Sequence, residues 1–126
     1  MQDAGDELKK ILIVDDEAQL VELLLMVLDD GQCELLCAYD GEEALELVRR
    51  ERPNVVLSDV MMPRLNGQDL CRQMKADSEL VHIPVILMSA MHRLDASECG
   101  AEELIRKPFD IMTVRETVNR LLSSAV

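Results

Sequence analysis

Short apolar runs alternate with amphipathic helical patterns along this 126-residue chain, and this alternation limits the folds that it can adopt. The apolar runs lie at residues 11–14, 33–39, 55–58, 84–89 and 102–105. Helical periodicity lies at residues 18–28, 40–50, 67–75 and 110–124, and residues 91–103 leave room for little more than a short fourth helix. Several apolar runs contain no alternating polar residue, which predicts parallel strands buried on both faces.

The predicted fold is a single α/β domain spanning residues 1–126, a three-layer αβα sandwich around a five-stranded parallel sheet. Residues 1–8 are mainly polar and are expected to form a frayed arm. Right-handed crossovers place the carboxyl ends of all the strands at one edge of such a sheet, where ligands bind. Functional residues are therefore expected directly after the strands.

The composition excludes several classes of protein. Apolar residues make up 48% of the chain but aromatic residues only 2%, so Leu, Ile, Val and Met must fill the core. The net charge of −12 argues against direct binding to nucleic acid, which needs clustered Lys and Arg. No apolar run approaches the length of a membrane span and no signal peptide opens the sequence, so we expect a cytoplasmic protein that does not bind membranes.

The four cysteines carry no metal-binding signature, because they form no CxxC pair and no histidine lies at zinc spacing from them. Cys33 and Cys37 are predicted to share one face of a strand as small core residues. The cysteines therefore indicate a reduced, cytoplasmic protein. His82 precedes a strand and His92 lies in a loop, and both are expected at the surface.

Two adjacent aspartates, Asp15 and Asp16, end the first apolar run in the sequence ILIVDDEAQ. Adjacent carboxylates repel each other, and partial burial increases that repulsion. Asp16 could cap the following helix, because aspartate accepts hydrogen bonds from the free N–H groups of a first turn. Capping accounts for only one aspartate and leaves Asp15 unexplained.

Three further polar side chains are predicted at the same edge of the sheet. Asp59 follows the third strand, Ser89 ends the fourth, and Lys107 comes after the fifth. Three carboxylates at close range need a cation, and hard oxygen ligands suit Mg²⁺, which keeps several of its waters. The paired aspartates are thus explained as a metal site that leaves Asp59 free to act as a nucleophile.

These residue types fit phosphoryl transfer. Attack of the Asp59 carboxylate on phosphorus would give an acyl phosphate. Phosphoryl transfer needs positioning and charge neutralisation more than covalent machinery. Lys107 and the Ser89 hydroxyl would each hold one phosphoryl oxygen, and Mg²⁺ would hold others.

Four motifs carry a resemblance to a known family, namely VDDE at 14–17, SDVMMPRLNG at 58–67, ILMSA at 86–90 and RKPF at 106–109. With these motifs in this order, roughly residues 9–122 resemble the receiver domain of two-component response regulators. The resemblance implies a flavodoxin-like receiver fold with strand order 2-1-3-4-5. It also implies a cis peptide bond before Pro108.

The resemblance further implies a phosphoacceptor signalling switch. Asp59 would be phosphorylated by a histidine kinase or a phosphotransfer protein. Asp16, Asp59 and the backbone carbonyl of Met61 would hold Mg²⁺ directly, with Asp15 helping through water. The phosphorylated domain would act on a downstream protein or a fused output domain, as a monomer or a weak homodimer. Such a domain phosphorylates and dephosphorylates itself and is not an enzyme that turns over external substrates.

Two departures from the family concern the output face, the surface that a partner recognises. In the family, the residues at positions 89 and 104 normally change this surface on phosphorylation. Leu104 stands where the family usually carries an aromatic residue, so the ring that normally turns inward on phosphorylation is missing. Ser89 and Lys107 are only 18 positions apart (107 − 89), about one helical turn of ~3.6 residues fewer than usual. The fourth helix is therefore expected to be shortened.

Three other functions compete with the phosphorylated switch. An aspartyl-nucleophile phosphohydrolase needs a general acid two residues after the nucleophile, and Met61 occupies that position. A flavin carrier would offer its first loop to a phosphate, but DDEAQ would repel one, and the chain has one Tyr, one Phe and no Trp to stack on a flavin. A pseudo-receiver, an interaction module that does not depend on phosphorylation, stays open because of Leu104.

Overall fold

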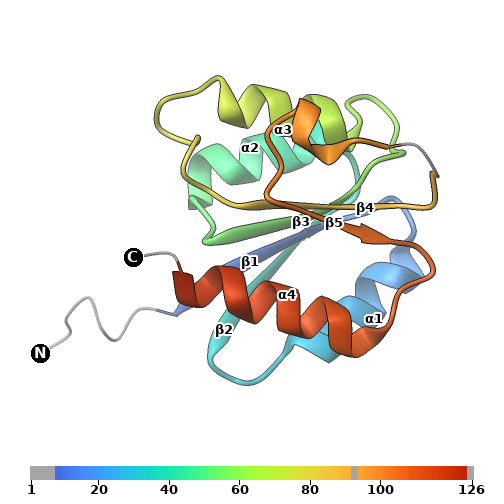
Figure 1. Ribbon diagram of the computed structural model, residues 1–126. Coiled ribbons are helices and arrows are strands. Elements are labelled where there is room, and N and C mark those ends of the chain that lie inside the picture. Colours follow the sequence, from blue (N-terminus) through green and yellow to red (C-terminus); the bar gives the residue numbers. More distant parts are fainter. Residues whose placement is uncertain (1–7, 92–93, 125–126) are drawn as a thin grey trace, which may run out of the picture.

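The computed structural model describes residues 8–91 and 94–124. The expected frayed arm, apart from Leu8, and the expected loop position of His92 lie outside these residues. The described residues form five strands and four α-helices that alternate along the chain (Figure 1). Their bounds are β1 (Lys9–Val14), α1 (Ala18–Leu28), β2 (Cys33–Ala38), α2 (Gly41–Glu51), β3 (Val55–Asp59), α3 (Gly67–Lys75), β4 (Val85–Ser89), β5 (Glu103–Arg106) and α4 (Ile111–Ser124).

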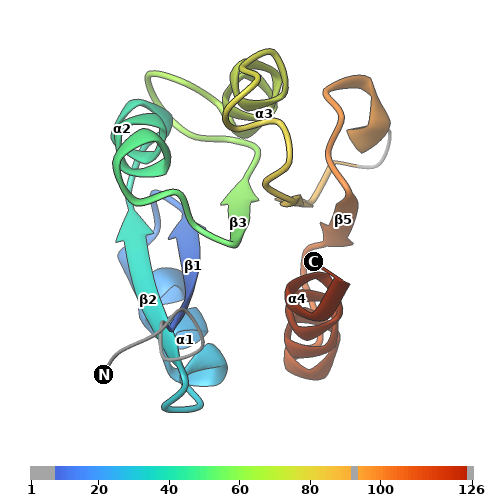
Figure 2. The same ribbon diagram turned by 90° about the vertical axis from the view of Figure 1, so that its left-hand side faces the viewer.

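The strands of the described sheet are all parallel and follow the order β2-β1-β3-β4-β5, which confirms the predicted topology. Helices α2 and α3 cover one face of the sheet, and α1 and α4 cover the other, so the domain is an αβα sandwich (Figure 1). Figure 2 shows β1, β2 and β3 running in the same direction. The register pairs Asp59 with Met88 and Ser89 with Arg106, so neighbouring strands end at one edge.

Two apolar clusters, one on each face of the sheet, hold the layers together. Ile11 and Ile13 of β1 belong to the cluster under α1 and α4, whereas Leu12 and Val14 belong to the cluster under α2 and α3. All four side chains are at most 1% exposed. Since successive side chains point to opposite faces of a strand, a strand covered on both faces must be apolar at every position. This requirement explains the unbroken apolar run of β1.

Side-chain caps fix where α2 and α4 begin. Asp40 Oδ1 accepts a hydrogen bond from Glu43 N at 2.8 Å. Glu43 Oε1 accepts from Tyr39 N at 2.8 Å, one residue before the N-cap itself. At the start of α4, Asp110 Oδ1 accepts from Met112 N at 2.9 Å. Both helices therefore begin directly after the aspartate that caps them.

The connection between β4 and β5 contains, among its described residues, only a 3₁₀ turn at Ala96–Glu98. This confirms the prediction that the helix between the fourth and fifth strands is shortened. Lys75 at the end of α3 fixes this connection, because its Nζ lies 2.8 Å from Glu102 Oε2. Glu102 Oε1 in turn accepts from Val85 N at 2.7 Å. With Glu102 bound in this way, β5 begins at Glu103, one residue later than predicted.

The sequence correctly predicts that Cys33 and Cys37 share one face of a strand and that His82 lies at the surface. The cysteines are all free thiols, and Cys33 and Cys37 pack half-buried against the cluster under α1 and α4. His82 is exposed. In the part of the chain that the structure describes, no helix has the length and apolar character needed to cross a membrane.

Gly67, the first residue of α3, has no room for a side chain. A Cβ atom there would lie 2.2 Å from the backbone oxygen of Asp59. We expect Gly67→Ala to lower the free energy of unfolding by about 3 kcal/mol, because backbone has to move. Gly31→Ala is the control: a Cβ there would meet no atom within 4 Å, and the positive φ of 76° should cost about 1 kcal/mol. Urea unfolding measures both losses, and equal losses would contradict the steric explanation.

Candidate functional site

Three carboxylates meet at the carboxyl edge of the sheet. Asp15 and Asp16 directly follow β1, and Asp59 ends β3, the neighbouring strand. One carboxylate oxygen of each residue lies within 4.8 Å of the others. Asp15 is fully buried and Asp59 is 7% exposed, whereas Asp16 is exposed. The structure thus brings together three aspartates that the sequence places at the ends of two strands.

The ammonium group of Lys107, which follows β5, lies among these carboxylates. Lys107 Nζ is 3.1 Å from Asp59 Oδ1 and 3.2 Å from Asp15 Oδ2. Lys107 N donates to Ser89 O at 2.9 Å, which joins the ends of β4 and β5 next to the site. One positive charge therefore faces three aspartates.

Burial and the neighbouring charges together set the protonation of the Asp59–Lys107 ion pair. Desolvation raises the pKa of the Asp59 carboxyl, and the nearby Asp15 charge adds to the rise, while Lys107 partly offsets it. Burial alone would lower the pKa of Lys107, but its interactions with Asp59 and Asp15 outweigh burial and raise that pKa. Lys107 therefore stays charged, and the Asp59 carboxylate lacks part of the solvation that it would have in water.

The donor set fits a hard divalent cation. Carboxylate oxygens are the ligands that Mg²⁺ prefers in proteins, and the ion keeps several waters, so it needs an open side. Asp15 and Asp59 form a buried wall, and the exposed Asp16 marks the side that faces solvent. These three residues could hold such an ion.

The backbone of Met61 lies in the loop that follows Asp59. Val60 N donates to Met88 O at 3.0 Å, and Gly67 N donates to Val60 O at 2.9 Å, so this loop is fixed at both ends. The Met61 side chain is exposed, which leaves the backbone carbonyl as the group that Met61 could offer to the site. Its role as a metal ligand stays a prediction.

Ser89 lies at the level of the carboxylates. It ends β4, where the neighbouring Met88 pairs with Asp59 in the sheet register. The residue is buried, and its Oγ accepts a hydrogen bond from Met91 N at 2.9 Å. The Ser89 Oγ atom is therefore held beside the end of β3, and its hydroxyl proton is not used by this bond.

The two remaining predicted residues lie on and after β5. Leu104 is half-buried and packs against the cluster under α2 and α3. The peptide bond between Lys107 and Pro108 is cis, as the resemblance implies.

The sequence reasoning misses Glu17, and the structure does not support the alternative that Asp16 caps the first helix. Helix α1 begins after Glu17 without a side-chain cap, and Glu17 N donates instead to Asp15 Oδ1 at 2.9 Å. Glu17 Oε1 also lies 3.9 Å from Lys107 Nζ, at the rim of the site. Its position directly after the aspartate pair is the signal that could have revealed it.

A parallel αβα sandwich with strand order 2-1-3-4-5 defines the class of flavodoxin-like α/β domains, and here the carboxyl edge of the sheet is acidic. Within that class, the family model described as "Response regulator receiver domain" matches residues 11–119. The chain therefore belongs to the response regulator receiver domain family.

Two of the relatives that this chain resembles carry the names of transcriptional regulators. The chain is 37% identical over 118 residues to the "Probable transcriptional regulator ycf27" of Cyanophora paradoxa. It is 34% identical over 118 residues to the alkaline phosphatase synthesis transcriptional regulatory protein PhoP of Bacillus subtilis. Each match covers 90% of this chain but 48% of the relative, so the chain spans about half the length of these proteins.

Solved receiver domains share the whole fold. The signal receiver domain of a signal transduction histidine kinase from Syntrophus aciditrophicus matches with a TM-score of 0.85 and 34% identity, over 91% of this chain and 90% of that one. The chemotaxis response regulator CheY4 of Vibrio cholerae matches with a TM-score of 0.82 and 27% identity, over 91% of this chain and 99% of that one. The described fold is thus that of a receiver domain.

Asp59→Asn is expected to raise the melting temperature of the metal-free domain at neutral pH. Burial raises the folded-state pKa of Asp59 above its unfolded value of about 3.9, so the ionised carboxylate destabilises the fold. The favourable contribution of the protonated carboxyl is complete below about pH 3.9 and is lost as the pH rises through the folded-state pKa. Melting curves in EDTA should therefore converge at low pH and separate as the pH rises. A variant less stable than wild type at pH 7 would contradict the effect of burial.

Proposed function

We propose that this receiver domain is a phosphoacceptor signalling switch. Asp59 receives a phosphoryl group from a histidine kinase or a phosphotransfer protein in a Mg²⁺-dependent reaction, and the modified domain changes the surface that it offers to a partner. The observation that carries this proposal is the cluster of Asp15, Asp16 and Asp59 around Lys107. Membership of the family supports it, because response regulator receiver domains are regulatory signalling domains.

The residues around Asp59 have separate roles in the transfer. An Asp59 carboxylate oxygen forms the new bond to phosphorus, while the bond from phosphorus to the donor breaks and the donor keeps the electron pair. Lys107 Nζ, 3.1 Å from Asp59 Oδ1, is placed to neutralise charge on a phosphoryl oxygen. Ser89 Oγ accepts from Met91 N, so the hydroxyl proton is able to donate to another phosphoryl oxygen.

The metal site is assigned to the acidic residues and one backbone group. Asp16, Asp59 and the carbonyl of Met61 would hold Mg²⁺ directly, and Asp15 would act through water. The ion would neutralise charge that develops on the phosphoryl oxygens. Asp15 is suited to the outer position, because its two oxygens already bind Glu17 N at 2.9 Å and Lys107 Nζ at 3.2 Å.

The partners follow from the same proposal. The phosphorylated domain would act on a downstream protein or on a fused output domain, from a cytoplasmic location and as a monomer or a weak homodimer. A net charge of −12 makes direct contact of this domain with nucleic acid unfavourable. The domain would also remove its own phosphoryl group, without turning over external substrates.

A pseudo-receiver that binds partners without phosphorylation is the second candidate function. Leu104 favours it, because leucine replaces the aromatic ring that usually turns inward. A modification shifts an equilibrium only by its different interaction with the two states. With a smaller side chain the two states differ less, so phosphorylation of Asp59 would shift the output face only weakly.

Acetyl phosphate with Mg²⁺ is expected to add one phosphoryl group to the domain, measured by intact mass spectrometry. Asp59→Asn should abolish the modification, because the variant lacks the nucleophilic carboxylate. Lys107→Met should slow it about a hundredfold, since a charge-neutralising donor is lost. Asp69→Asn is the control, because Asp69 pairs with Arg72 on α3 and lies outside the cluster. Modification that persists in Asp59→Asn would refute the assignment.

Mg²⁺ is expected to raise the thermal stability of the domain, because an ion that binds only the folded state stabilises it by mass action. The gain should reach about 2.7 kcal/mol at a Mg²⁺ concentration of about 100 times Kd. Thermal melts of Asp16→Ala with and without Mg²⁺ should coincide. An equal gain in that variant would indicate general ionic screening in place of a site.

A further inference from the structure

The loop between β3 and α3, residues 60–66, contains a turn with an uncommon backbone. Arg64 has a φ of 68°, in the left-handed region that residues other than glycine seldom adopt. Leu65 N donates to Pro63 O at 2.8 Å, so the chain turns within three residues around Arg64. Such a backbone persists only where surrounding groups hold it.

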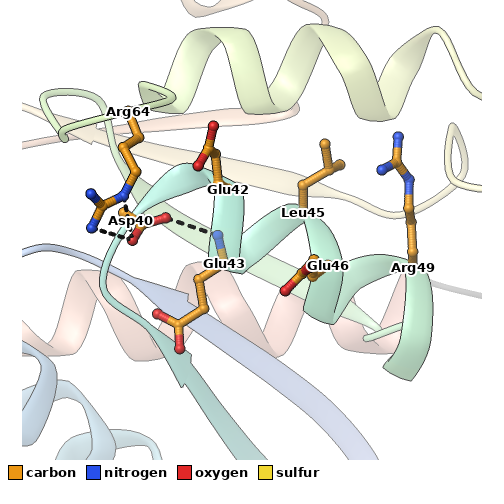
Figure 3. A pocket seen from close by; sticks show the side chains of 7 residues that line it. All are labelled: Asp40, Glu42, Glu43, Leu45, Glu46, Arg49 and Arg64. Atoms are coloured by element: carbon orange, nitrogen blue, oxygen red, sulfur yellow. Dashed lines mark hydrogen bonds and ion pairs between the residues drawn. The ribbon is translucent and has the colours of Figure 1, made fainter.

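The guanidinium group of Arg64 is bound by Asp40, the N-cap of α2 (Figure 3). Arg64 Nε and a terminal guanidinium nitrogen each lie 3.2 Å from Asp40 Oδ2. The other oxygen, Asp40 Oδ1, accepts from Glu43 N at 2.8 Å. The bond from Glu43 and then the bond from Arg64 hold the pKa of Asp40 below its usual range. One ionised carboxylate therefore joins the first turn of α2 to the turn at Arg64.

A backbone contact beside this ion pair leaves the loop little freedom. A Cβ atom on Gly41, the first residue of α2, would lie 1.9 Å from the backbone oxygen of Leu65. At the other end of the loop, Gly67 N donates to Val60 O at 2.9 Å. Met61 lies between these two contacts, so the position of its backbone depends on α2 as well as on β3.

We propose that Asp40 and Arg64 are positioning residues for the phosphoacceptor site. Their ion pair holds the turn at Arg64, and through it the backbone of Met61, in place beside Asp59. This inference rests on the proposed function, because it gives the pair a role in metal binding and phosphoryl transfer. In this role neither residue touches the metal or the phosphoryl group, and the pair acts on the geometry of the site.

The pair lies in an open cleft of about 440 Å³ beside α2 (Figure 3). Glu42, Glu46 and Arg49 also line this cleft, so it carries charges of both signs. The Arg64 side chain is 61% exposed and that of Asp40 is 14% exposed. Salt screens an exposed ion pair, so the positioning effect should weaken as the ionic strength rises.

Substitutions can separate the ion pair from the other contacts of these residues. Asp40→Asn removes the charge but keeps the helix cap, because asparagine caps as well as aspartate does. Arg64→Ala removes the guanidinium group, and Arg64→Lys keeps its charge. Arg72→Ala is the matched control, because it breaks the Arg72–Asp69 pair, 2.7 Å long, on α3, and Arg72 is 50% exposed against 61% for Arg64.

The readouts are the Kd for Mg²⁺ from calorimetric titration without a phosphodonor, the exchange rate of the Leu65 amide, and the phosphorylation rate with acetyl phosphate. Asp40→Asn and Arg64→Ala are each expected to weaken Mg²⁺ binding about threefold to fivefold at low salt. Both should also speed Leu65 exchange and slow phosphorylation. The double variant should bind no more weakly than either single variant, because both remove one interaction. Arg64→Lys should recover most of the affinity, and Arg72→Ala should match wild type.

Long-range electrostatics gives a different result from positioning. Loss of the Asp40 charge would weaken binding of a cation, but loss of the Arg64 charge would strengthen it. Stronger Mg²⁺ binding by Arg64→Ala would therefore overturn the positioning role. Where the wild type binds Mg²⁺ and accepts a phosphoryl group, an affinity for Mg²⁺ that is unchanged in both Asp40→Asn and Arg64→Ala would also overturn it. A wild type that neither binds Mg²⁺ nor is phosphorylated would overturn the proposed function, and this inference with it.

Discussion

The position of the Lys107 ammonium group between Asp15 and Asp59 is the interaction on which the rest of the site depends. Both carboxylates are buried, and each lies within 3.2 Å of Lys107 Nζ. Without that charge, two buried carboxylates would repel each other in a medium of low dielectric. One ammonium group cannot balance three aspartates, however, because Asp16 also lies within 4.8 Å of the pair. The folded domain thus retains an excess of negative charge at this edge, which a divalent cation would neutralise.

The sheet and the aspartate cluster could be predicted from the sequence, because both follow from simple rules. A strand covered on both faces is apolar throughout, and parallel strands end at one edge, so the residue after each run reaches the site. The Asp40–Arg64 pair could not be predicted, because its partners are 24 positions apart and nothing marks Arg64 as a residue with positive φ. The start of β5 could not be predicted for a similar reason, since Glu102 binds Lys75 of a helix that is distant in the sequence.

Side chains of α3 hold the β4–β5 connection in place, whereas a full helix between these two strands would be held by its own packing. Lys75 Nζ binds Glu102 Oε2 at 2.8 Å, and the Cys71 thiol donates to the backbone oxygen of Cys99 at 3.3 Å. These contacts tie the 3₁₀ turn and the start of β5 directly to α3. Leu104, two residues after Glu102, packs against the same apolar cluster as α3. The surface on this side of the sheet is therefore built differently from one formed by a full helix.

Local rules of backbone geometry and charge are broken in this domain mainly around the site, as is usual where function competes with stability. Arg64 holds a φ of 68° in the loop after Asp59, and Asp15 and Asp16 place like charges side by side. Among the described residues the other non-glycine residue with positive φ is Arg52, which ends α2 with an ordinary left-handed cap. The apolar clusters that stabilise the fold run along the strands up to this edge, where Val14 precedes Asp15 and Val60 follows Asp59. Because the buried carboxylates of Asp15 and Asp59 directly adjoin the apolar core, the contacts that define the fold hold these like charges together against their repulsion.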